Sequence, residues 1–160
     1  MKNKTTFSLS FIFLLLVMGL SCNNANQNNP NVPKVNINLT IDPNSTLFLE
    51  LNTPGGWIYL DEVPGTYIPY PSRGIIVYRQ DINFFKAYER QPPNDPFKCC
   101  DDQNQTCGKL VVGANYPFVL DTCTGTMYQL LDGTLFSGTG EFPLIEYYAA
   151  YDGALLHISN

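Results

Sequence analysis

Short segments in which apolar and polar residues alternate constrain the fold of this chain most. In "VNINLTI", residues 35–41, every second residue is apolar, so an extended strand would bury one face and expose the other. Comparable segments recur along the chain, separated by turns such as "PSRG" and "YDG". The sequence predicts strands at residues 35–41, 46–51, 55–60, 74–79, 82–89, 109–112, 116–120, 126–131, 144–151 and 154–159.

About ten short strands without a helical apolar stripe favour an all-β domain, either a small antiparallel barrel or a sandwich. The chain has 160 residues, which suits one domain of ordinary size, and 13% aromatic residues supply its core. We expect a signal peptide at residues 1–21, a disordered tether at 22–34 and the β domain at 35–160.

The first 21 residues have the features of an export signal. Lys2 and Lys4 precede "FSLSFIFLLLVMGL", an apolar run that is short for a membrane-spanning helix. Ser21 then directly precedes Cys22, which resembles the lipobox of bacterial lipoproteins, although Leu20 stands two residues before the cysteine and the strict pattern has three. We therefore expect lipid on Cys22. The alternative is an ordinary cleaved signal with Cys22 as a free thiol.

The segment after Cys22, "NNANQNNPNVPK", can bury little apolar surface and therefore predicts the tether. Loss of residues 1–21 removes Lys2 and Lys4, so seven basic residues remain against fourteen acidic ones, a net charge of −7. An acidic chain without a basic cluster is not expected to bind nucleic acid. The expected partners are a membrane, through the lipid, and an unidentified protein. The expected location is the outer membrane, on its periplasmic face or at the cell surface.

Two separate regions carry an ordered set of short motifs. The first is "FFKAYERQPPN", and the second is "FVLDTCTGTMYQLLDG", followed by "SGTG" and "PL". In this order the motifs resemble the Rieske domain, a β fold that holds a [2Fe–2S] cluster on two hairpin loops. The resemblance covers roughly residues 56–160. The matching residues are Phe85, Ala87, Tyr88, Arg90, Gly125, Thr126, Tyr128, Asp132, Gly133, Ser137, Gly138, Gly140, Pro143 and Leu144.

The cluster ligands of that family are absent here. A Rieske centre needs two cysteine thiolates and two histidine imidazoles. The resemblance places Pro92 and Asn94 at the first Cys and His positions, and Asp121 and Thr124 at the second. The only histidine of the chain, His157, lies in the last expected strand. We therefore expect no cluster and no other cofactor.

Four cysteines follow Cys22. An exported chain meets an oxidising compartment, so disulfides are expected among Cys99, Cys100, Cys107 and Cys123. Four cysteines allow three pairings, of which an adjacent Cys99–Cys100 bond would be strained. Many Rieske domains join their two loops by a disulfide, and the resemblance implies Cys100–Cys123, which leaves Cys99 for Cys107. The rival interpretation is a four-cysteine metal site, which the missing C-x2-C knuckles disfavour.

The aromatic residues suggest where a partner could bind. Residues 63–74, "VPGTYIPYPSRG", are rich in Tyr and Pro and could offer a sticky surface, with a rigid turn as the alternative. Tyr147 and Tyr148 are neighbours in an expected strand, so they must point to opposite faces, and one of them can be exposed.

No catalytic motif is recognisable in the sequence. Asp101, Asp102 and Asp121 are interpreted as solvated loop charges. His157 has no nucleophile motif around it and is interpreted as a partly exposed strand residue. We therefore expect a lipid-anchored binding or structural module rather than an enzyme. The alternative is the function that the resemblance would imply, a Rieske-type [2Fe–2S] electron-transfer protein.

Overall fold

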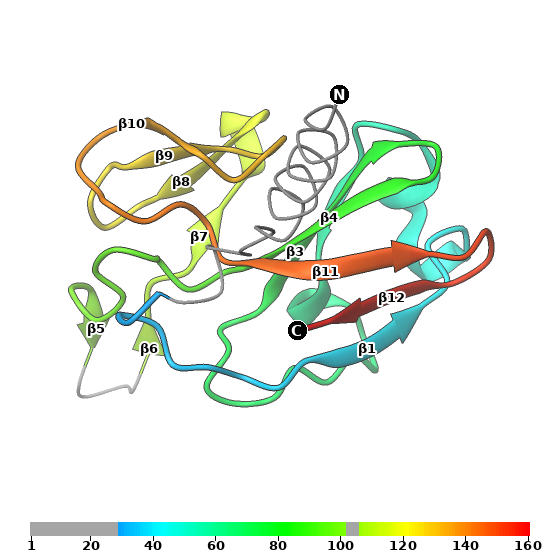
Figure 1. Ribbon diagram of the computed structural model, residues 1–160, viewed down its shortest axis with the longest axis horizontal. Coiled ribbons are helices and arrows are strands. Elements are labelled where there is room, and N and C mark those ends of the chain that lie inside the picture. Colours follow the sequence, from blue (N-terminus) through cyan, green and yellow to red (C-terminus); the bar gives the residue numbers. More distant parts are fainter. Residues whose placement is uncertain (1–28, 102–105) are drawn as a thin grey trace, which may run out of the picture.

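The structure is a computed structural model that describes residues 29–101 and 106–160, and its fold is all-β, as predicted (Figure 1). In this part of the chain no helix has the length and apolar character needed to cross a membrane. The strands are β1 (Asn38–Ile41), β2 (Trp57–Tyr59), β3 (Ile75–Asp81), β4 (Phe84–Glu89), β5 (Cys100–Asp101), β6 (Thr106–Cys107), β7 (Leu110–Val111), β8 (Phe118–Asp121), β9 (Met127–Gln129), β10 (Leu135–Ser137), β11 (Glu146–Tyr151) and β12 (Leu156–Ser159), and the 3-10 helices are η2 (Thr46–Asn52), η3 (Leu60–Glu62) and η4 (Gly113–Asn115).

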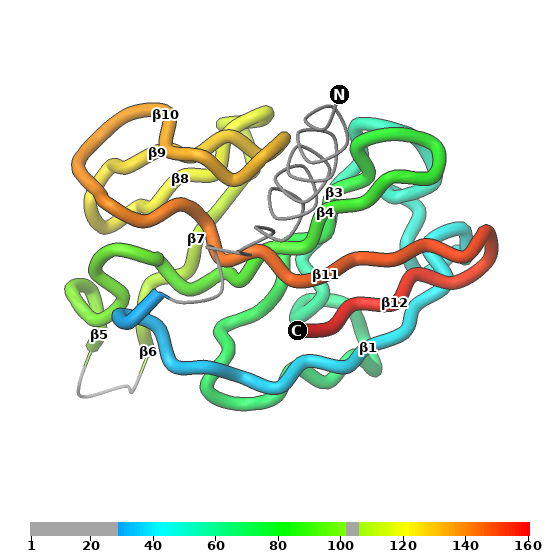
Figure 2. The backbone as a smooth tube through the Cα atoms, viewed as in Figure 1, coloured from blue at the N-terminus to red at the C-terminus, as the bar shows by residue number. Residues whose placement is uncertain are grey.

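The strands form three antiparallel sheets. The large sheet has the order β1-β12-β11-β4-β3-β2, the small sheet has the order β10-β9-β8-β7, and β5 pairs with β6 in a two-stranded ribbon. Figure 2 shows the last strand, β12, lying between β1 and β11, so the two ends of the domain meet in one sheet. The small sheet and the ribbon lie together at the other side of the molecule (Figure 1).

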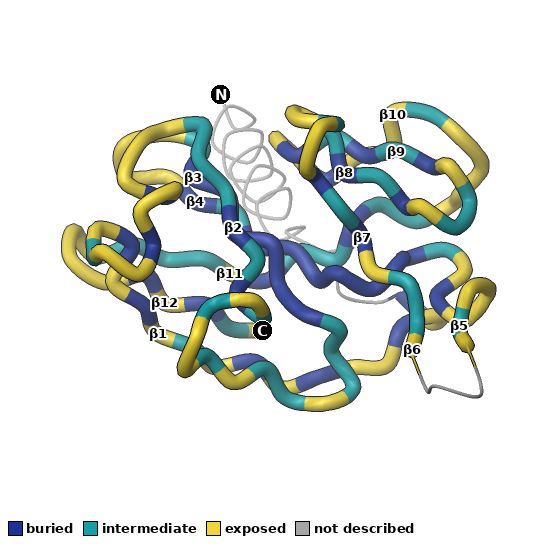
Figure 3. The backbone as a smooth tube through the Cα atoms, turned by 180° about the vertical axis from the view of Figure 1, so that it is seen from behind, coloured by how far each residue is buried: buried dark blue, intermediate teal, exposed yellow. Residues whose placement is uncertain are grey.

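Strands β3 and β4 are buried on both faces because a separate core covers each face of the large sheet here. Ile75 and Val77 point into the first core, whereas Ile76 and Tyr78 point toward the small sheet. Figure 3 shows this part of the backbone as a continuous buried stretch. The first core holds Val35, Ile37, Ile41, Phe48, Leu51, Ile58, Leu60, Phe85, Ala87, Tyr147, Leu156 and Ile158, and the second holds Tyr88, Leu110, Val112, Val119, Tyr128, Leu130 and Leu144.

The alternation predicted for residues 35–41 is confirmed. Val35, Ile37 and Ile41 are buried in the first core, with Leu39 packed against it. The strand itself is shorter than expected and begins at Asn38. The prediction for the neighbouring tyrosines also holds, since Tyr147 is 4% exposed and Tyr148 is 67% exposed.

The strand predicted at residues 46–51 is wrong, because this segment forms the 3-10 helix η2. Its buried residues are Phe48 and Leu51, whereas Leu47 and Leu49 are each 61% exposed. A spacing of three between buried residues is the period of a 3-10 helix. The leucines at every second position of "TLFLEL" therefore gave a pattern that also fits a strand.

The domain also begins earlier than expected. Residues 29–34 were predicted to be the end of the tether, yet Asn29 and Val32 are buried. The side-chain Nδ2 of Asn29 donates to the carbonyl oxygen of Pro93 at 2.7 Å. This segment therefore lies against the loop that follows β4. The expected signal peptide and Cys22 lie outside the described residues.

Candidate functional site

Asn94, in the loop after β4 (the first loop), binds strand β9 and the loop after β10 (the third loop). Its Nδ2 donates to the phenol oxygen of Tyr128 on β9 at 2.8 Å and to the carbonyl oxygen of Phe142 at 2.9 Å. Its Oδ1 accepts the backbone N–H groups of Glu141 and Phe142 at 2.7 and 2.8 Å. A Cβ on Gly140 would come within 2.5 Å of Nδ2, so this close approach requires glycine. The Asn94 carboxamide is thus engaged at both ends.

Tyr128 accepts this contact as a neutral phenol. Its side chain is buried in the second core, and burial raises its pKa to about 12, while the hydrogen bond from Asn94 acts in the opposite direction. A neutral phenol oxygen can accept from the Asn94 amide and keep its own proton for donation. The contact therefore needs no charge and holds throughout the neutral pH range.

Asp121 and Thr124 organise the second loop, which follows β8. The Asp121 side chain accepts the backbone N–H of Cys123 at 2.9 Å and the hydroxyl of Thr124 at 2.6 Å. Thr126 continues the network, because its hydroxyl donates to the carbonyl oxygen of Thr139 at 3.1 Å. Asp121 is 3% exposed, which corrects its interpretation as a solvated loop charge. These hydrogen bonds fix the conformation of the second loop.

The four positions aligned with cluster ligands do not fit a [2Fe–2S] cluster. Pro92 is buried and offers neither a thiolate nor a backbone donor. Asn94, Asp121 and Thr124 supply no imidazole or thiolate, and their polar atoms bind other protein groups. Within residues 29–101 and 106–160, no group of three or more His, Cys, Asp or Glu side chains could hold a metal ion.

His157 lies away from these loops, on β12 in the large sheet. It is exposed, as expected. Its Nδ1 lies 3.1 Å from the hydroxyl of Thr40 and its Nε2 lies 3.3 Å from the Asp152 carboxylate. The residue thus takes part in surface contacts between β1, β12 and the turn after β11.

All four cysteines of the domain form disulfides, but the pairing implied by the resemblance is wrong. The bonds join Cys99 to Cys123 and Cys100 to Cys107. Cys100 and Cys107 are opposite each other in the ribbon β5–β6. Cys99 lies in the turn just before the ribbon, and its sulfur bonds Cys123 in the second loop instead. The loop-to-loop disulfide exists, displaced by one residue.

A pocket of about 640 Å³ lies beside this disulfide-linked region, and we call it the tyrosine pocket. Tyr67 and Tyr70 line it from residues 63–74, the segment expected to bind a partner, and Phe97 lines it from the loop after β4. Their exposed fractions are 76%, 92% and 62%. The segment thus presents exposed aromatic rings. The polar lining residues are Asp61, Thr66, Ser72, Arg73, Gln91, Thr106 and Lys109, and the Cys107 side of the ribbon completes one wall.

A buried carboxylate, Glu89, fixes the wall that carries Arg73. Glu89 is 1% exposed, and its Oε1 accepts the backbone N–H groups of Arg73 and Gln91 at 2.9 and 3.0 Å. Its Oε2 accepts the hydroxyl of Tyr147 at 2.6 Å. Burial first, and then the charge of Glu89, raise the pKa of Tyr147 well above its usual value. Glu89 therefore holds the loop before β3 to the end of β4.

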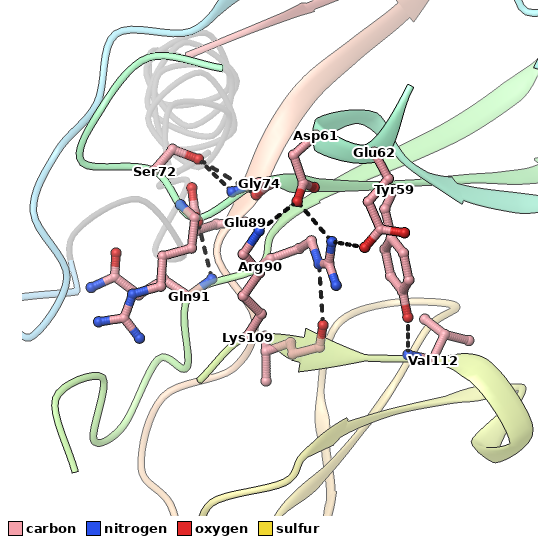
Figure 4. Close-up of polar contacts among 12 residues, drawn as sticks. Tyr59, Asp61, Glu62, Ser72, Gly74, Glu89, Arg90, Gln91, Lys109 and Val112 are labelled. Atoms are coloured by element: carbon pink, nitrogen blue, oxygen red, sulfur yellow. Dashed lines mark hydrogen bonds and ion pairs between the residues drawn. The ribbon is translucent and has the colours of Figure 1, made fainter. Parts of the chain in front are cut away.

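Arg90 joins the two sheets and holds Asp61, which lines the tyrosine pocket (Figure 4). Its Nη1 lies 2.8 Å from both Asp61 and Glu62, and its Nε donates to the carbonyl oxygen of Leu110. Its guanidinium also lies over the ring of Tyr59, 3.6 Å from the centroid. Four protein groups thus surround one guanidinium that is almost fully buried.

Lys109 shares the Asp61 carboxylate with Arg90, at 2.8 Å from Oδ2. Gly74, at a φ of +126°, lies against the same carboxylate, and a Cβ at this position would clash with it. The Tyr59 hydroxyl accepts the backbone N–H of Val112 at 2.7 Å, which adds a second link between the sheets. Asp61 and Lys109, which both line the tyrosine pocket, are therefore held in a cross-linked framework.

Sequence reasoning missed Glu89 as a functional residue and treated Arg90 only as a matching residue. The available signal was "YERQPP", in which two residues of opposite charge, Glu89 and Arg90, come at the end of an expected strand. A charge in such a place is buried only with partners. The partners of Arg90, Asp61 and Glu62, lie almost thirty residues earlier, and no local pattern connects them. Arg73 and Lys109 were likewise not singled out.

Compared with known protein families and with curated proteins, the chain matches none.

Proposed function

We propose that this chain is a lipid-anchored, exported binding module with a Rieske-like fold that carries no iron–sulfur cluster. The observation that carries the proposal is the tyrosine pocket, where exposed Tyr67, Tyr70 and Phe97 lie among polar residues that ion pairs and hydrogen bonds hold in place. Tyrosine is one of the residues that contribute most of the binding energy in protein interfaces. Exposed tyrosines on a fixed support suit this role. The proposed partner is a protein, bound through this pocket.

The polar groups of the pocket favour binding over catalysis. Asp61 is already paired with Arg90 and Lys109. The carboxylate of Glu89, behind the pocket wall, accepts three hydrogen bonds from the protein itself. Groups held in this way support a surface, whereas a general acid or base needs a lone pair or proton directed at a substrate.

Two features support the Rieske-like part of the proposal. The loops after β4 and β8 are joined by the Cys99–Cys123 disulfide, and Asn94 connects the first loop with β9 and the third loop. The loops that these contacts join come in the same order along the chain as the motifs of the resemblance. The electron-transfer alternative lacks comparable support, because the aligned positions offer no cluster ligands.

The proposed location is the outer membrane, with lipid on Cys22 and the domain on the periplasmic face. The support is the sequence before Asn29: a positively charged start, an apolar run and a cysteine after a small residue. Multiple acyl chains anchor a protein stably where one chain does not. A Cys22→Ser variant is expected to leave the membrane fraction after a salt wash. Sedimentation of this variant with membranes would contradict the proposal, and proteolysis of intact cells tests the membrane face.

Site-specific photo-crosslinking in native cells tests the binding pocket. A benzoylphenylalanine residue at position 70 is expected to give discrete protein adducts. The matched control carries it at position 148, because Tyr148 is also an exposed tyrosine, on strand β11. Equal adduct patterns at both positions, or adducts at 148 alone, would refute the pocket as the binding surface.

A further inference from the structure

The disulfide Cys100–Cys107 lies at the wall of the tyrosine pocket, and Cys107 contributes to the lining of that wall. Both cysteines are partly exposed. The second disulfide, Cys99–Cys123, joins two loops and keeps them together independently of the first. Opening of the Cys100–Cys107 bond would therefore leave the loop connection in place.

A cation lies beside one of the two sulfur atoms of this bond. The Nη2 of Arg73 is 3.8 Å from the Sγ of Cys100, and its Nη1 donates to the carbonyl oxygen of Gly108 at 2.9 Å. The guanidinium also lies 5.6 Å from the centroid of the Phe97 ring. Burial lowers the pKa of Arg73 and Glu89 opposes this, but a guanidinium stays charged at any physiological pH.

The position of Arg73 makes the two sulfurs unequal. In thiol–disulfide exchange the rate rises as the departing thiol becomes a more stable thiolate, and it depends on which sulfur is accessible. A neighbouring Arg stabilises a thiolate. Cys100 is therefore the favoured leaving group, and Cys107, at the pocket wall, is the sulfur open to attack.

We propose that the tyrosine pocket is a thiol–disulfide exchange site, at which an external protein dithiol reduces the Cys100–Cys107 disulfide. This inference adds a class of partner to the proposed binding function and rests on the same pocket. The exposed rings of Tyr67, Tyr70 and Phe97 would receive the protein that carries the dithiol.

The reaction balances in two steps. A thiolate of the dithiol attacks Sγ of Cys107, which forms a mixed disulfide and breaks the Cys100–Cys107 bond. The electron pair of that bond leaves on Cys100 as a thiolate, next to the Arg73 guanidinium. The second thiol of the dithiol then loses its proton to solvent and attacks its own neighbour in the mixed disulfide. It releases Cys107 as a thiolate, so the dithiol is oxidised and this disulfide is reduced by two electrons.

The test uses dithiothreitol as the dithiol and the purified full chain, so it does not depend on capture of a partner. Samples are quenched with an alkylating reagent over time, and peptide mapping follows each cysteine. Cys100 and Cys107 are expected to become alkylated several-fold faster than Cys99 and Cys123. Faster opening of Cys99–Cys123 would overturn the proposal, whatever the crosslinking at position 70 shows.

Variants of Arg73 separate the leaving-group effect from simple exposure. Arg73→Met is expected to slow opening of Cys100–Cys107 roughly threefold to tenfold and to leave Cys99–Cys123 unchanged. Arg73→Lys keeps a cation and is expected to restore most of the rate. The control is Lys86→Met, which removes a cation on β4 that does not line the pocket and is expected to change the rate by less than about twofold.

Two outcomes would contradict the role of Arg73. One is an unchanged rate in Arg73→Met, and the other is an equal loss in Arg73→Met and Lys86→Met. If Arg73→Met loses its fold, both disulfides open together at a raised rate. Arg73→Lys then decides, because a rate close to that of the wild-type protein supports the proposal and a rate several-fold lower than that, with Cys99–Cys123 unchanged, refutes it.

Discussion

The carboxamide of Asn94 donates to the phenol oxygen of Tyr128 at 2.8 Å and thereby ties the loop after β4 to strand β9. Asn94 also bonds the backbone of Phe142 in both directions, through N–H and through C=O. One side chain thus holds together segments that lie about 34 to 48 residues apart in the chain. The proposed Rieske-like alignment puts a metal ligand at this position, and under that proposal hydrogen bonds to protein groups take the place of a metal–ligand bond.

Replacement of Asn94 is expected to destabilise the domain. Asn94→Ala leaves two backbone N–H groups and one carbonyl in the third loop without their partner, and each such loss costs on the order of 1 kcal/mol or more. We expect the free energy of unfolding to fall by roughly 2 to 4 kcal/mol, measured by urea denaturation. Asn36→Ala, at an exposed position, is the matched control and is expected to change it by less than about 0.5 kcal/mol. Similar values for both variants would contradict the role of Asn94.

The disulfide pairing can be checked by peptide mapping without reduction. We expect peptides that join Cys99 to Cys123 and Cys100 to Cys107. Any Cys100–Cys123 peptide in the folded protein would show that the pairing is incorrect. The sample is digested at acidic pH, because thiolates exchange disulfides at alkaline pH.

The two disulfides are expected to differ in how much they stabilise the domain. The Cys99–Cys123 bond closes a loop with a sequence separation of 24, and the Cys100–Cys107 bond closes one of 7. The loss of chain entropy predicts roughly 3.5 kcal/mol for the longer loop and about 2.5 kcal/mol for the shorter one. Paired Cys→Ser variants measured by denaturation should preserve this order. The reverse order would mean that the short bond constrains the native fold in some further way.

Sequence patterns predicted the strands because they report which face of a local segment is buried. The alternation from Val35 to Ile41 and the opposed pair Tyr147–Tyr148 depend only on neighbours in one strand. The same reasoning failed for residues 46–51, because three-residue burial and two-residue alternation both fit "TLFLEL". Strands β5, β6 and β10 were not predicted, since "CD", "TC" and "LFS" lie among turn-forming or polar residues and continue no longer apolar pattern.

The site was harder to predict because its contacts are distant in the sequence. The four candidate ligand positions lie in or beside two loops that the Cys99–Cys123 disulfide joins, but their hydrogen bonds were not predictable from residue type alone. The partner of Cys123 depended on which of two adjacent cysteines faced the ribbon β5–β6, a choice set by tertiary structure. The contacts of Glu89 with Arg73 and Tyr147 likewise join residues that only the folded chain brings together.

Ionisation of the Tyr128 phenol is expected to destabilise the domain at alkaline pH. Its pKa rises from 10 in a free phenol to about 12 in the fold, chiefly through burial. A group with a raised folded pKa contributes its full stability below the unfolded pKa of about 10 and loses it as pH rises through the folded value. Between pH 10 and 12 the wild-type protein should therefore lose more stability than Tyr128→Phe, since the variant has no phenol to ionise at this place.

Denaturant midpoints at pH 9, 10, 11 and 12 measure this difference between the two proteins. Tyr70→Phe is the control, because Tyr70 is 92% exposed and its loss should leave the pH profile unchanged. Parallel curves for the wild-type protein and Tyr128→Phe would show that the Tyr128 phenol is not protected by the fold. The tyrosinate absorbance that Tyr128→Phe removes should appear near pH 12.

Iron–sulfur reconstitution tests the proposal that hydrogen bonds, and not a metal cluster, join these loops. Added iron and sulfide are expected to leave the wild-type protein without visible charge-transfer absorption, because Pro92, Asn94, Asp121 and Thr124 provide neither thiolate nor imidazole. A variant that combines Pro92→Cys, Asn94→His, Asp121→Cys and Thr124→His introduces all four ligands at the aligned positions. If the loops have the Rieske-like arrangement, this variant should acquire absorption on reconstitution. It should also unfold more easily without iron, since it lacks the hydrogen bonds of Asn94 and Asp121.

Stoichiometric iron in the wild-type protein would refute the metal-free interpretation. A folded variant that remains colourless would refute the alignment of the loops.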